Sequence, residues 1–427
     1  MTDLTDALLR KLLAHRLPDI DLGKDAQHPA YGGLSLLNIP SSVCKWLGAP
    51  ALSHPPLEIP ELDSLAAGVE QVVAVLVDAV ALHRFLPWLK GRAKSLQPLV
   101  DEGFLGASTS SVPSTTSTAL TTLWTGRSPA EHGILGYEIF LKEYGLVANM
   151  ITHTPASFDG RAGLLYSAGL DPESFLPVPT IGPHLTQADV EPHAFLHYSI
   201  SGSGLSRMHF RDVQPHTFGG IADLWIGVRR LADQPLHMKR FIWVYYGGVD
   251  GLSHRHGPDS EQAQADFASF SSSMMEDFVR QVSPEVGAKT LLLLFADHGQ
   301  ITTHKDPNFE LRNHPDLTQR LHILPTGENR LPYLYIRLGQ TEAVGEYIRE
   351  TWPGAFSTLP SDDALKAGLF GPGIPAATSP DRIGDCIVVT HGDSYMWWAE
   401  KENPLIGRHG GLSSEEMLVP LFAARLG

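Results

Sequence analysis

Three short apolar runs, each leading to an aspartate, are the feature that most constrains how this chain can fold. The runs are Val72–Val77, Phe241–Tyr246 and Leu291–Ala296, and the aspartates that follow them are Asp78, Asp250 and Asp297. Continuous apolar runs without alternation are typical of strands buried on both faces, as in a parallel sheet covered by helices. The stretches Ile221–Ala232 and Ser260–Val282 have helical patterns, and Asp259 is expected to cap the second. We therefore predict an α/β fold with a central, mostly parallel sheet.

The three aspartates predict a shared site. Ligands of open α/β sheets bind at the carboxyl ends of the strands. One aspartate after a strand is as often a turn residue or a helix cap as a functional group. Three of them at three strand ends are much less readily explained in that way.

Composition limits the classes of partner. Of the 427 residues, 43% are hydrophobic and 19% are charged, which is ordinary for a globular protein with a core. There are 32 Lys and Arg against 47 Asp and Glu, a formal charge of −15. Such a chain binds nucleic acid duplexes and anionic membranes poorly. A phosphate-handling site in it would need local positive charge, most simply from metal ions.

Cysteines and termini give weaker expectations. Cys44 and Cys386 are too few for a disulfide framework or a thiolate zinc site. The segment Met1–Asp6 has no basic region followed by an apolar stretch, so it does not resemble a secretory signal. The apolar runs are far shorter than the ~20 residues that span a bilayer. We expect a soluble, cytoplasmic protein.

Residues 305–403 differ in pattern from the rest of the chain. We interpret them as a small α+β insertion into a core made of residues 1–304 and 404–427. The insertion is expected to return partly to the main sheet near Ile387–Val389. Its other recognisable segments are a strand-like run, a helix-like run and a Pro/Gly-rich run, at Tyr333–Leu338, Glu342–Thr351 and Gly368–Pro380.

A loop rich in Ser and Thr, residues 112–118, leads into a predicted helix that ends at Gly126. A hydroxyl at the start of a helix lies where free N–H groups and the helix dipole favour an anion. That position suits an alkoxide nucleophile or a bound phosphoryl group. An isolated loop of this kind more often only caps its helix, so the loop alone does not decide between the two.

Three further segments carry potential metal ligands. Asp250 and His254 lie four residues apart in a stretch of small residues, Asp297 and His298 are adjacent at a strand end, and His409 precedes two glycines. Asp and His ligands without a thiolate fit zinc, manganese or iron, and zinc is preferred for a hydrolytic site that contains histidine.

Together these segments resemble the alkaline phosphatase superfamily, and within it the type I phosphodiesterase/nucleotide pyrophosphatase family, from about Val72 to Pro420. The family's nucleophile is a Thr three residues after a Pro and ten before a Gly, which corresponds to Thr116. The family pattern Asp-x-x-Gly-His-x-x-Gly-Pro is matched from Asp250 to Pro258, with Ser253 in place of the first Gly. Its Asp-His-Gly and late His-Gly patterns are matched as well, at Asp297–Gly299 and His409–Gly410.

The resemblance implies a three-layer sandwich of the alkaline phosphatase type and two divalent metal ions, most simply zinc, with manganese as the alternative. One ion would be held by Asp78, Thr116, Asp297 and His298, and the other by Asp250, His254 and His409. Two such ions can activate one oxygen nucleophile and neutralise the transferred phosphoryl group. The implied activity is hydrolysis of phosphodiester or nucleotide pyrophosphate bonds through a phospho-threonine intermediate.

One departure from the family concerns the substrate. Many relatives have an Asn after the His-Gly that here is His132-Gly133, and it binds a phosphate oxygen. This chain has Tyr137 in that region, whose hydroxyl can also donate a hydrogen bond. Asn149 is the alternative donor.

Several functions remain open beside the leading one. A phosphomonoesterase, a phosphonate hydrolase or a phosphomutase would have the same fold, and a metal-bound scaffold without catalysis is the rival from a different class. A sulfatase is disfavoured because neither Cys44 nor Cys386 lies in a Cys-x-Pro-x-Arg context. The expected partner is a small phosphate ester or nucleotide, and self-association into a homo-oligomer is compatible with the sequence.

Overall fold

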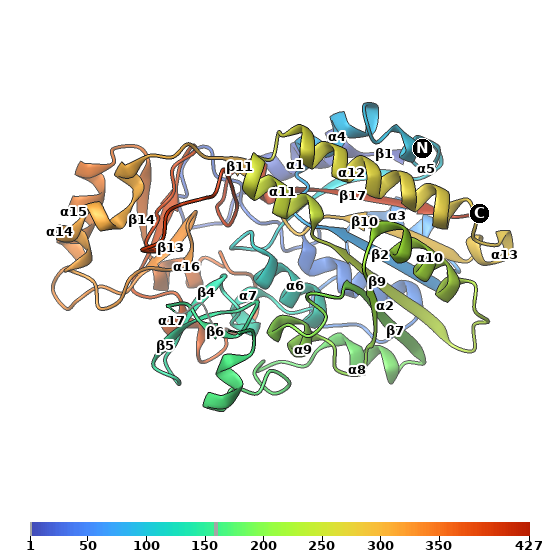
Figure 1. Ribbon diagram of the computed structural model, residues 1–427, viewed down its shortest axis with the longest axis horizontal. Coiled ribbons are helices and arrows are strands. Elements are labelled where there is room, and N and C mark those ends of the chain that lie inside the picture. The colour runs from blue at the N-terminus through green and yellow to red at the C-terminus, as the bar shows by residue number, and fades with distance from the viewer. Residues whose placement is uncertain (1, 158–160) are drawn as a thin grey trace.

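The protein is built around two β-sheets, described here from a computed structural model for residues 2–157 and 161–427 (Figure 1). Among these residues the larger sheet has eight strands in the order β1-β3-β17-β10-β2-β9-β7-β8. Their bounds, in that order, are Thr2–Asp3, Phe104–Thr109, Leu418–Arg425, Thr290–Phe295, Gln71–Val77, Lys239–Tyr246, Val190–His197 and Gln214–Phe218.

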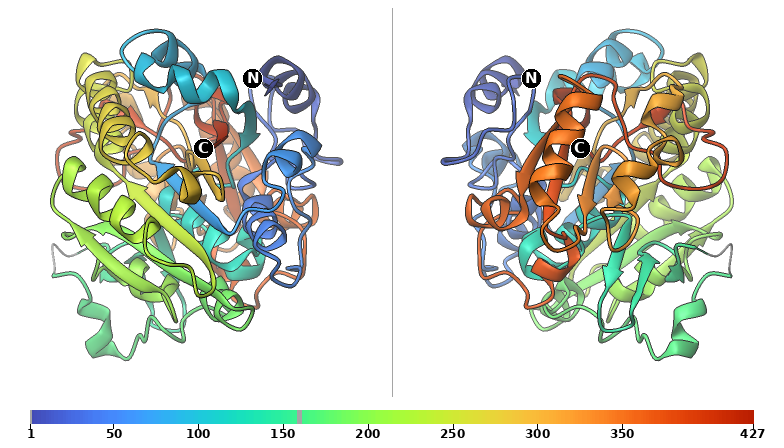
Figure 2. Two further views of the ribbon diagram at one scale, coloured as in Figure 1. Left: turned by 90° about the vertical axis from the view of Figure 1, so that its right-hand side faces the viewer. Right: turned by 90° about the vertical axis from the view of Figure 1, so that its left-hand side faces the viewer.

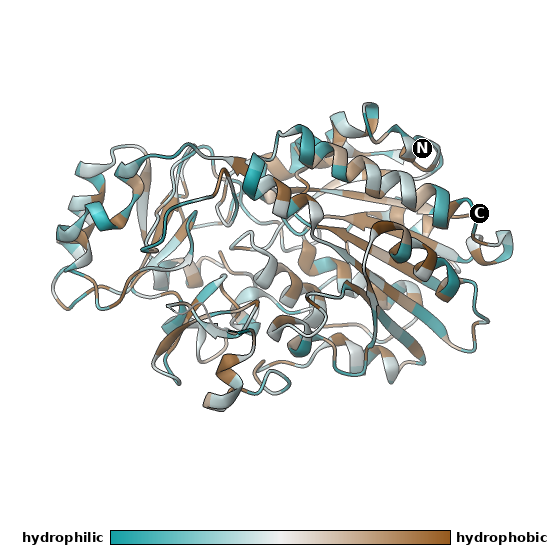
Figure 3. Cartoon of the chain, viewed as in Figure 1, coloured by the Kyte–Doolittle hydropathy of each residue, from teal (hydrophilic) through white to brown (hydrophobic). Residues whose placement is uncertain are grey.

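The larger sheet is mostly parallel, as the sequence predicts. Strands β10, β2, β9, β7 and β8 run parallel, and β1 is parallel to β3. Strand β17 is antiparallel to both of its neighbours. The three predicted runs form adjacent strands at the centre, β10, β2 and β9, and all residues of β2 and β10 are buried. Brown, hydrophobic residues are frequent in the strands at the centre of this sheet in Figure 3.

Alternate side chains of β9 contact helices on opposite faces of this sheet. On one face Trp243 packs against Trp124 of helix α6 (Thr116–Thr125), with ring centroids 5.4 Å apart. On the other face Tyr246 stacks on Phe270 of helix α12 (Glu261–Ser273) at 4.3 Å. Because successive residues of a strand point to opposite faces, these contacts define a helix–sheet–helix sandwich.

The expected helices are present with small differences. Helix α10 spans Ile221–Ala232, as predicted. Helix α12 continues into a π-helical segment, Met274–Val279, so the predicted helix is not one regular α-helix. Its N-cap is Ser260, whose Oγ accepts a hydrogen bond from the Ala263 N–H, and Asp259 instead pairs with Arg84 at 2.8 Å. The expected cap at Asp259 is therefore wrong.

The remaining α-helices lie around the two sheets. In chain order they are α1 (Thr5–Ala14), α2 (Ile39–Leu47), α3 (Pro60–Leu65), α4 (Leu82–Lys90), α5 (Gln97–Glu102), α7 (Pro129–His132), α8 (Ile181–Thr186), α9 (Gly204–His209), α11 (Gly248–His256), α13 (Pro284–Gly287), α14 (Pro315–Thr318), α15 (Thr341–Thr351), α16 (Ser361–Lys366), α17 (Ser379–Arg382) and α18 (Ser414–Met417). None of the helices in the described part of the chain has the length and hydrophobicity to cross a bilayer.

The smaller sheet has seven strands in the order β14-β15-β13-β12-β4-β5-β6 within the described ranges. The orange segments that form much of it face the viewer on the right of Figure 2. The bounds are Phe356–Pro360, Cys386–Thr390, Leu331–Leu334, Thr326–Glu328, Glu138–Leu141, Leu146–Asn149 and Thr154–Pro155, in the order of the sheet. A two-stranded ladder of β11 (Ile301–Thr302) and β16 (Gly407–Arg408) lies next to α11.

The strand at Ile387–Val389 corrects one sequence expectation. It belongs to β15, which pairs with β13 and β14 in the smaller sheet and does not return to the main sheet. The smaller sheet also takes up β4, β5 and β6, which lie before residue 305 in the sequence. The contact between the two parts of this sheet is the pairing of Gly327 in β12 with Glu138 in β4.

Candidate metal centre and active site

The three aspartates that follow the apolar runs lie at neighbouring strand ends. Asp78 directly follows β2, Asp297 lies two residues beyond β10, and Asp250 lies in the first turn of α11, shortly after β9. Because β10, β2 and β9 are adjacent and parallel, their carboxyl ends meet at the same edge of the sheet. The structure thus brings together the carboxylates that the sequence predicts to share a site.

Thr116 is the first residue of α6 and faces this cluster. The loop after β3 leads to Thr115, which has extended backbone angles. Helix α6 begins at Thr116 and ends before Gly126, which has a φ of +60°. The Oγ1 atom of Thr116 lies 3.4 Å from Asp78 Oδ2 and 3.1 Å from His298 Nε2. The predicted nucleophile is therefore in contact with two predicted ligands.

All three predicted histidine ligands use the same ring geometry. The Nδ1 atoms of His254, His298 and His409 lie 2.9, 3.1 and 3.2 Å from backbone carbonyl oxygens. A carbonyl oxygen only accepts hydrogen bonds, so each Nδ1 carries the ring proton. In the neutral rings each Nε2 then presents a lone pair, as a metal ligand does when its other nitrogen is held in this way.

Each of these Nε2 atoms faces a carboxylate. His254 Nε2 lies 3.3 Å from Asp250 Oδ1, and His409 Nε2 lies 3.9 Å from the same oxygen. His298 Nε2 lies 3.4 Å from Asp78 Oδ1 and 3.5 Å from Asp297 Oδ2. Lone pairs of neutral imidazoles and carboxylates repel one another unless a cation lies between them.

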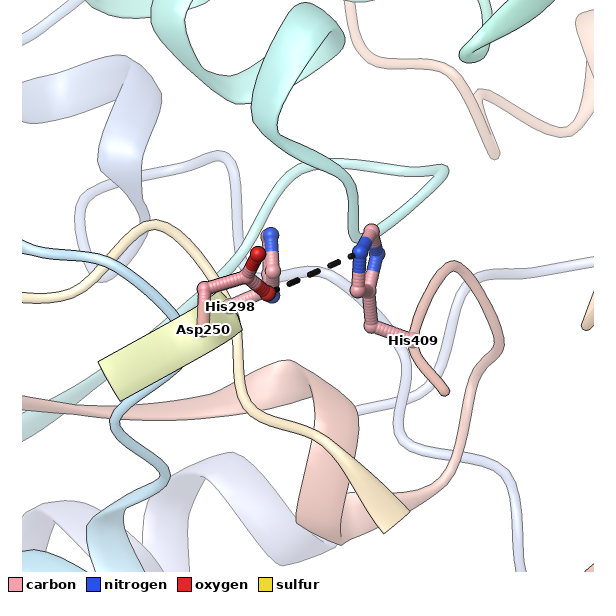
Figure 4. A group of neighbouring side chains, drawn as sticks. All are labelled: Asp250, His298 and His409. Carbon is pink, nitrogen blue, oxygen red and sulfur yellow. Dashed lines mark ion pairs between the residues drawn. The ribbon is translucent and has the colours of Figure 1, made fainter. Parts of the chain in front are cut away.

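The ligand atoms form two overlapping groups that fit metal ions. One group is Asp78, Asp297 and His298, and the other is Asp250, His298 and His409 (Figure 4), each with ligand atoms within 4.8 Å of one another. The Oδ1 atom of Asp78 and the Oδ2 atom of Asp297 are buried without a hydrogen-bond partner. Since a buried polar atom is normally paired, these two oxygens fit metal coordination.

The electrostatics of the cluster agree with this interpretation. Burial raises the pKa of the Asp78 carboxyl well above its usual range, and the nearby Asp297 and Asp250 raise it further. Burial also raises the pKa of Asp297, to about 7. Burial lowers the pKa of His409, and His298 and His254 lower it further, so this ring is neutral. Divalent cations would offset the repulsion among the carboxylates.

Two contacts that support the ligands were not predicted from the sequence. The Tyr245 hydroxyl donates a hydrogen bond to Asp78 Oδ2, and Gln300 Nε2 donates one to Asp250 Oδ1 at 2.5 Å. Tyr245 is on the same face of β9 as Trp243, which is the face covered by α6. The sequence held one indication of Gln300, namely its position directly after the Asp297-His298-Gly299 motif.

Tyr137 is placed close to the nucleophile loop through a buried glutamate. The Tyr137 N–H donates to Glu328 Oε1 at 2.8 Å, and the Glu328 carboxyl also forms a hydrogen bond with the Thr115 side chain. Tyr137 is 39% exposed, and its hydroxyl lies near the Asn149 side chain. The two alternative donors of the sequence analysis are thus neighbours. Glu328 had no motif that could have identified it.

The fold is of the alkaline phosphatase type. The chain belongs to the type I phosphodiesterase/nucleotide pyrophosphatase family, whose model matches residues 72–412. Membership places the protein among the phosphoester hydrolases and confirms the family predicted from the sequence. No curated protein gives a significant sequence match.

Solved structures show the same fold at low sequence identity. Murine ectonucleotide pyrophosphatase/phosphodiesterase 5 is 14% identical and superposes with a TM-score of 0.61, covering 82% of this chain and 87% of its own. An inactive variant of that protein, 13% identical, was solved in complex with AMP, with the same TM-score and coverage. Phosphonoacetate hydrolase from Sinorhizobium meliloti, in complex with phosphonoformate, is 18% identical with a TM-score of 0.59, covering 84% of this chain and 91% of its own.

Proposed function

We propose that the protein hydrolyses phosphodiesters with two divalent metal ions and Thr116 as the nucleophile. The observation that carries this proposal is the common orientation of His254, His298 and His409. Each has its Nδ1 bound to a carbonyl and its Nε2 directed at a carboxylate. A structural role does not explain why three histidines of one cluster share this orientation. Metal coordination does explain it, because a ligating histidine presents one nitrogen to the metal and donates from the other.

The ligands divide between the two ions as follows. Asp78, Asp297, His298 and the Thr116 oxygen hold one, and Asp250, His254 and His409 hold the other. The division is supported by the contacts of Asp250 with His254 and His409, and of His298 with Asp78, Asp297 and Thr116. Ligands that are only N and O donors and include histidine favour zinc over magnesium or calcium.

The ions, when bound, lower the pKa of the threonine hydroxyl and offset the charge of the phosphoryl group. Asp78 and His298 hold Thr116 Oγ1 at the edge of the sheet, and the Tyr245 hydroxyl fixes the Asp78 carboxylate. The free backbone N–H groups of the first turn of α6 would donate hydrogen bonds to the phosphate oxygens of a bound substrate.

The reaction proceeds in two displacements at phosphorus. Thr116 Oγ1 forms a bond to phosphorus as the bond to the leaving alkoxide breaks on the opposite side, and the Thr116 proton is released. Water then attacks from the vacated side, the bond from phosphorus to Oγ1 breaks, and Thr116 regains a proton. The second product is a phosphomonoester that keeps the other ester group.

The surroundings of Thr116 support a diester over a monoester substrate. A monoester carries one more negative charge, and an enzyme for it would add cationic side chains. Arg127 pairs with Glu131 at 3.2 Å, and the Arg408 guanidinium is hydrogen-bonded to Thr303 and lies 3.8 Å from the centroid of the Tyr395 ring. Neither arginine is available to an additional phosphate oxygen. Tyr137 supplies an uncharged donor in its place.

The proposal is tested by comparing three substrates with added zinc or manganese. They are 4-nitrophenyl phosphate, its phenyl diester and a nucleotide pyrophosphate. We expect the phenyl diester to have a higher kcat/KM than 4-nitrophenyl phosphate, and we expect a strong chelator to abolish turnover. Turnover that withstands the chelator, or a preference for 4-nitrophenyl phosphate, would contradict the proposal. The Thr116→Ala variant, prepared in parallel, controls for contaminating phosphatases.

A further inference from the structure

A small apolar cavity of about 60 Å³ adjoins the nucleophile. Thr116 and Tyr245 line it on the side of the proposed metal centre. Leu120 and Trp124, on the following turns of α6, form a second wall. The other apolar residues of the lining are Ile151, Leu196, Ile200, Leu205, Phe210 and Trp243. The cavity therefore lies along α6, between this helix and the face of the main sheet that carries Trp243.

Among the residues that the structure describes, no charged side chain lines this cavity. Its polar groups besides Thr116 and Tyr245 are Ser203, Ser206 and His209. The Ser203 and Ser206 hydroxyls lie 3.0 Å apart, and Ser206 Oγ also donates to the Ile200 carbonyl at 2.9 Å. His209 Nε2 lies 3.0 Å from Thr121 Oγ1, and burial lowers the pKa of His209 to about 3. The three groups are thus neutral near pH 7 and are engaged with neighbours.

The position of the cavity decides which part of a diester it can hold. In an in-line displacement the leaving group departs opposite the attacking atom. A cavity with Thr116 in its wall lies on the attacking side, so the leaving group does not reach it. The ester group that stays on phosphorus can reach it.

We propose that this cavity binds the retained ester group of the substrate, and that this group is compact, uncharged and apolar, of about the size of a phenyl ring. The inference deepens the proposed function and rests on it. One water needs about 10–15 Å³ of such volume, so the cavity has room for on the order of five non-hydrogen atoms. A phenyl ring matches that room, whereas a nucleoside exceeds it. A carboxylate or ammonium group would be buried there without a partner of opposite charge.

The test uses the zinc-loaded protein and four diesters with 4-nitrophenolate as the common leaving group. Their retained groups are phenyl, methyl, 2-carboxyethyl and thymidin-5′-yl. We expect kcat/KM to be highest for the phenyl ester, about 10–100-fold above the methyl ester, because that is the range that filling an apolar pocket gives. The carboxyethyl and thymidine esters should be no better than the methyl ester.

Two variants connect this preference to the cavity. Ile200 is half-buried at its edge, so Ile200→Trp should fill the cavity without disrupting the core. It should abolish the preference for phenyl over methyl, because a phenyl group can no longer enter the filled cavity. Ile221→Trp is the matched control, because Ile221 is also half-buried but lies on α10, outside the cavity lining.

A second measurement does not depend on turnover. Trp124 and Trp243 both line the cavity, so its occupation should change the intrinsic fluorescence. In the wild type and in Ile221→Trp we expect phenylphosphonate to bind at least about tenfold more tightly than methylphosphonate. In Ile200→Trp the two phosphonates should bind with the same, weak affinity.

The outcomes separate the two proposals. Hydrolysis of all four diesters at similar rates, or equal affinity for the two phosphonates, would overturn the cavity assignment and leave the proposed function intact. Selective binding of phenylphosphonate without hydrolysis of any diester would overturn the proposed function and support the cavity as an apolar binding site. A preference for the thymidine ester would overturn the assignment of a compact group.

Discussion

Thr116 Oγ1 lies 3.1 Å from His298 Nε2, and this contact connects the first turn of α6 to the end of strand β10. The same oxygen lies 3.4 Å from Asp78 Oδ2, at the end of β2. Three segments far apart in the sequence thus meet at one hydroxyl. The contact distinguishes Thr116 from the other hydroxyls of its loop, which could be ranked from the sequence only through the family resemblance.

Replacing Thr116 by Ala should reduce diester hydrolysis by at least about 10³-fold, because the attacking atom is lost. Thr116→Ser should keep partial activity, and both variants should still bind metal through the remaining ligands. Ser114 donates to the Gly411 carbonyl at 2.7 Å, so Ser114→Ala is the control for a loop hydroxyl with a structural contact. Steady-state kinetics that show Thr116→Ala near the wild-type rate would contradict the assignment.

Metal analysis should find close to two divalent ions per chain. Asp250→Asn or His409→Ala should lose mainly one of them, because both residues belong to the same proposed set. Asp266→Asn is the matched control, since Asp266 lies on α12 and accepts hydrogen bonds from Tyr246 outside the cluster. Elemental analysis of dialysed protein gives the count. Loss of no ion from Asp250→Asn would show that the ligands are misassigned.

The sequence was most informative at the carboxyl ends of the predicted strands. Asp78 and Asp297 could be assigned to one site because each follows a continuous apolar run, and such runs form neighbouring parallel strands. Their assignment with His298 to the same ion came from the family resemblance. His254 and His409 depended on the family resemblance, because nothing in their local sequence indicates which distant carboxylate they face.

Other features of the structure could not be predicted from local sequence patterns. Ile387–Val389 has the same apolar pattern as a strand of the main sheet, and a pattern of this kind does not identify the partner strand. Glu328 approaches Thr115 only because β12 pairs with β4, which is a contact between segments distant in sequence. The cavity beside Thr116 combines side chains from six separate segments, and no motif records such a combination.

Tyr137→Phe should lower kcat/KM for the diester while leaving the fold unchanged, because only a partly exposed hydroxyl is removed. If that hydroxyl donates to the charge that develops on phosphorus, the loss should reach about 10²–10³-fold. Asn149→Ala tests the alternative donor, whose side chain lies near the Tyr137 hydroxyl. Kinetics at saturating zinc measure both. Unchanged kinetics in Tyr137→Phe would exclude the tyrosine as a donor.

Glu328 should make stability fall as the pH rises. Burial raises the pKa of its carboxyl to about 8, above the value of 4.5 for an unperturbed glutamate. Between these two values the unfolded chain releases the proton while the folded protein retains it, so the free energy of unfolding decreases with pH. This contribution is fully present below about pH 4.5 and is lost as the pH rises toward about 8.

Glu328→Gln tests this dependence because glutamine is close in shape to the protonated acid and can accept the same hydrogen bond from the Tyr137 N–H. The variant should have a Tm about 2–4 °C above that of the wild type at pH 8, and a similar Tm at pH 4.5. Thermal unfolding of both proteins in the presence of a chelator measures the difference without a contribution from metal binding. A variant that is less stable than the wild type at pH 8 would contradict the protonated state.

The buried ion pair of Arg330 and Glu416 should support the loop that carries His409. Both side chains are 0% exposed, with Nη2 2.9 Å from Oε2 and Nε 3.1 Å from Oε1. Glu416 Oε1 also accepts the Gly411 N–H at 2.9 Å, two residues from His409. Arg330 directly precedes β13 of the smaller sheet, so the pair joins that sheet to the metal-binding loop.

Arg330→Met should destabilise the protein by about 3–5 kcal/mol, because it leaves the Glu416 carboxylate buried without its counter-ion. It should also weaken zinc binding by about tenfold, as loss of a group that orients a ligand does. Adding Glu416→Gln to Arg330→Met removes the unpaired charge and keeps the acceptor for Gly411, so it should restore much of the lost stability and of the lost zinc affinity.

Arg92→Met is the control, since the pair of Arg92 with Glu261 is exposed and its loss should cost at most about 1 kcal/mol. Denaturant unfolding and zinc titration of the wild type, Arg330→Met, Glu416→Gln and the double variant give the coupling energy, and a value near zero would contradict this role of the pair.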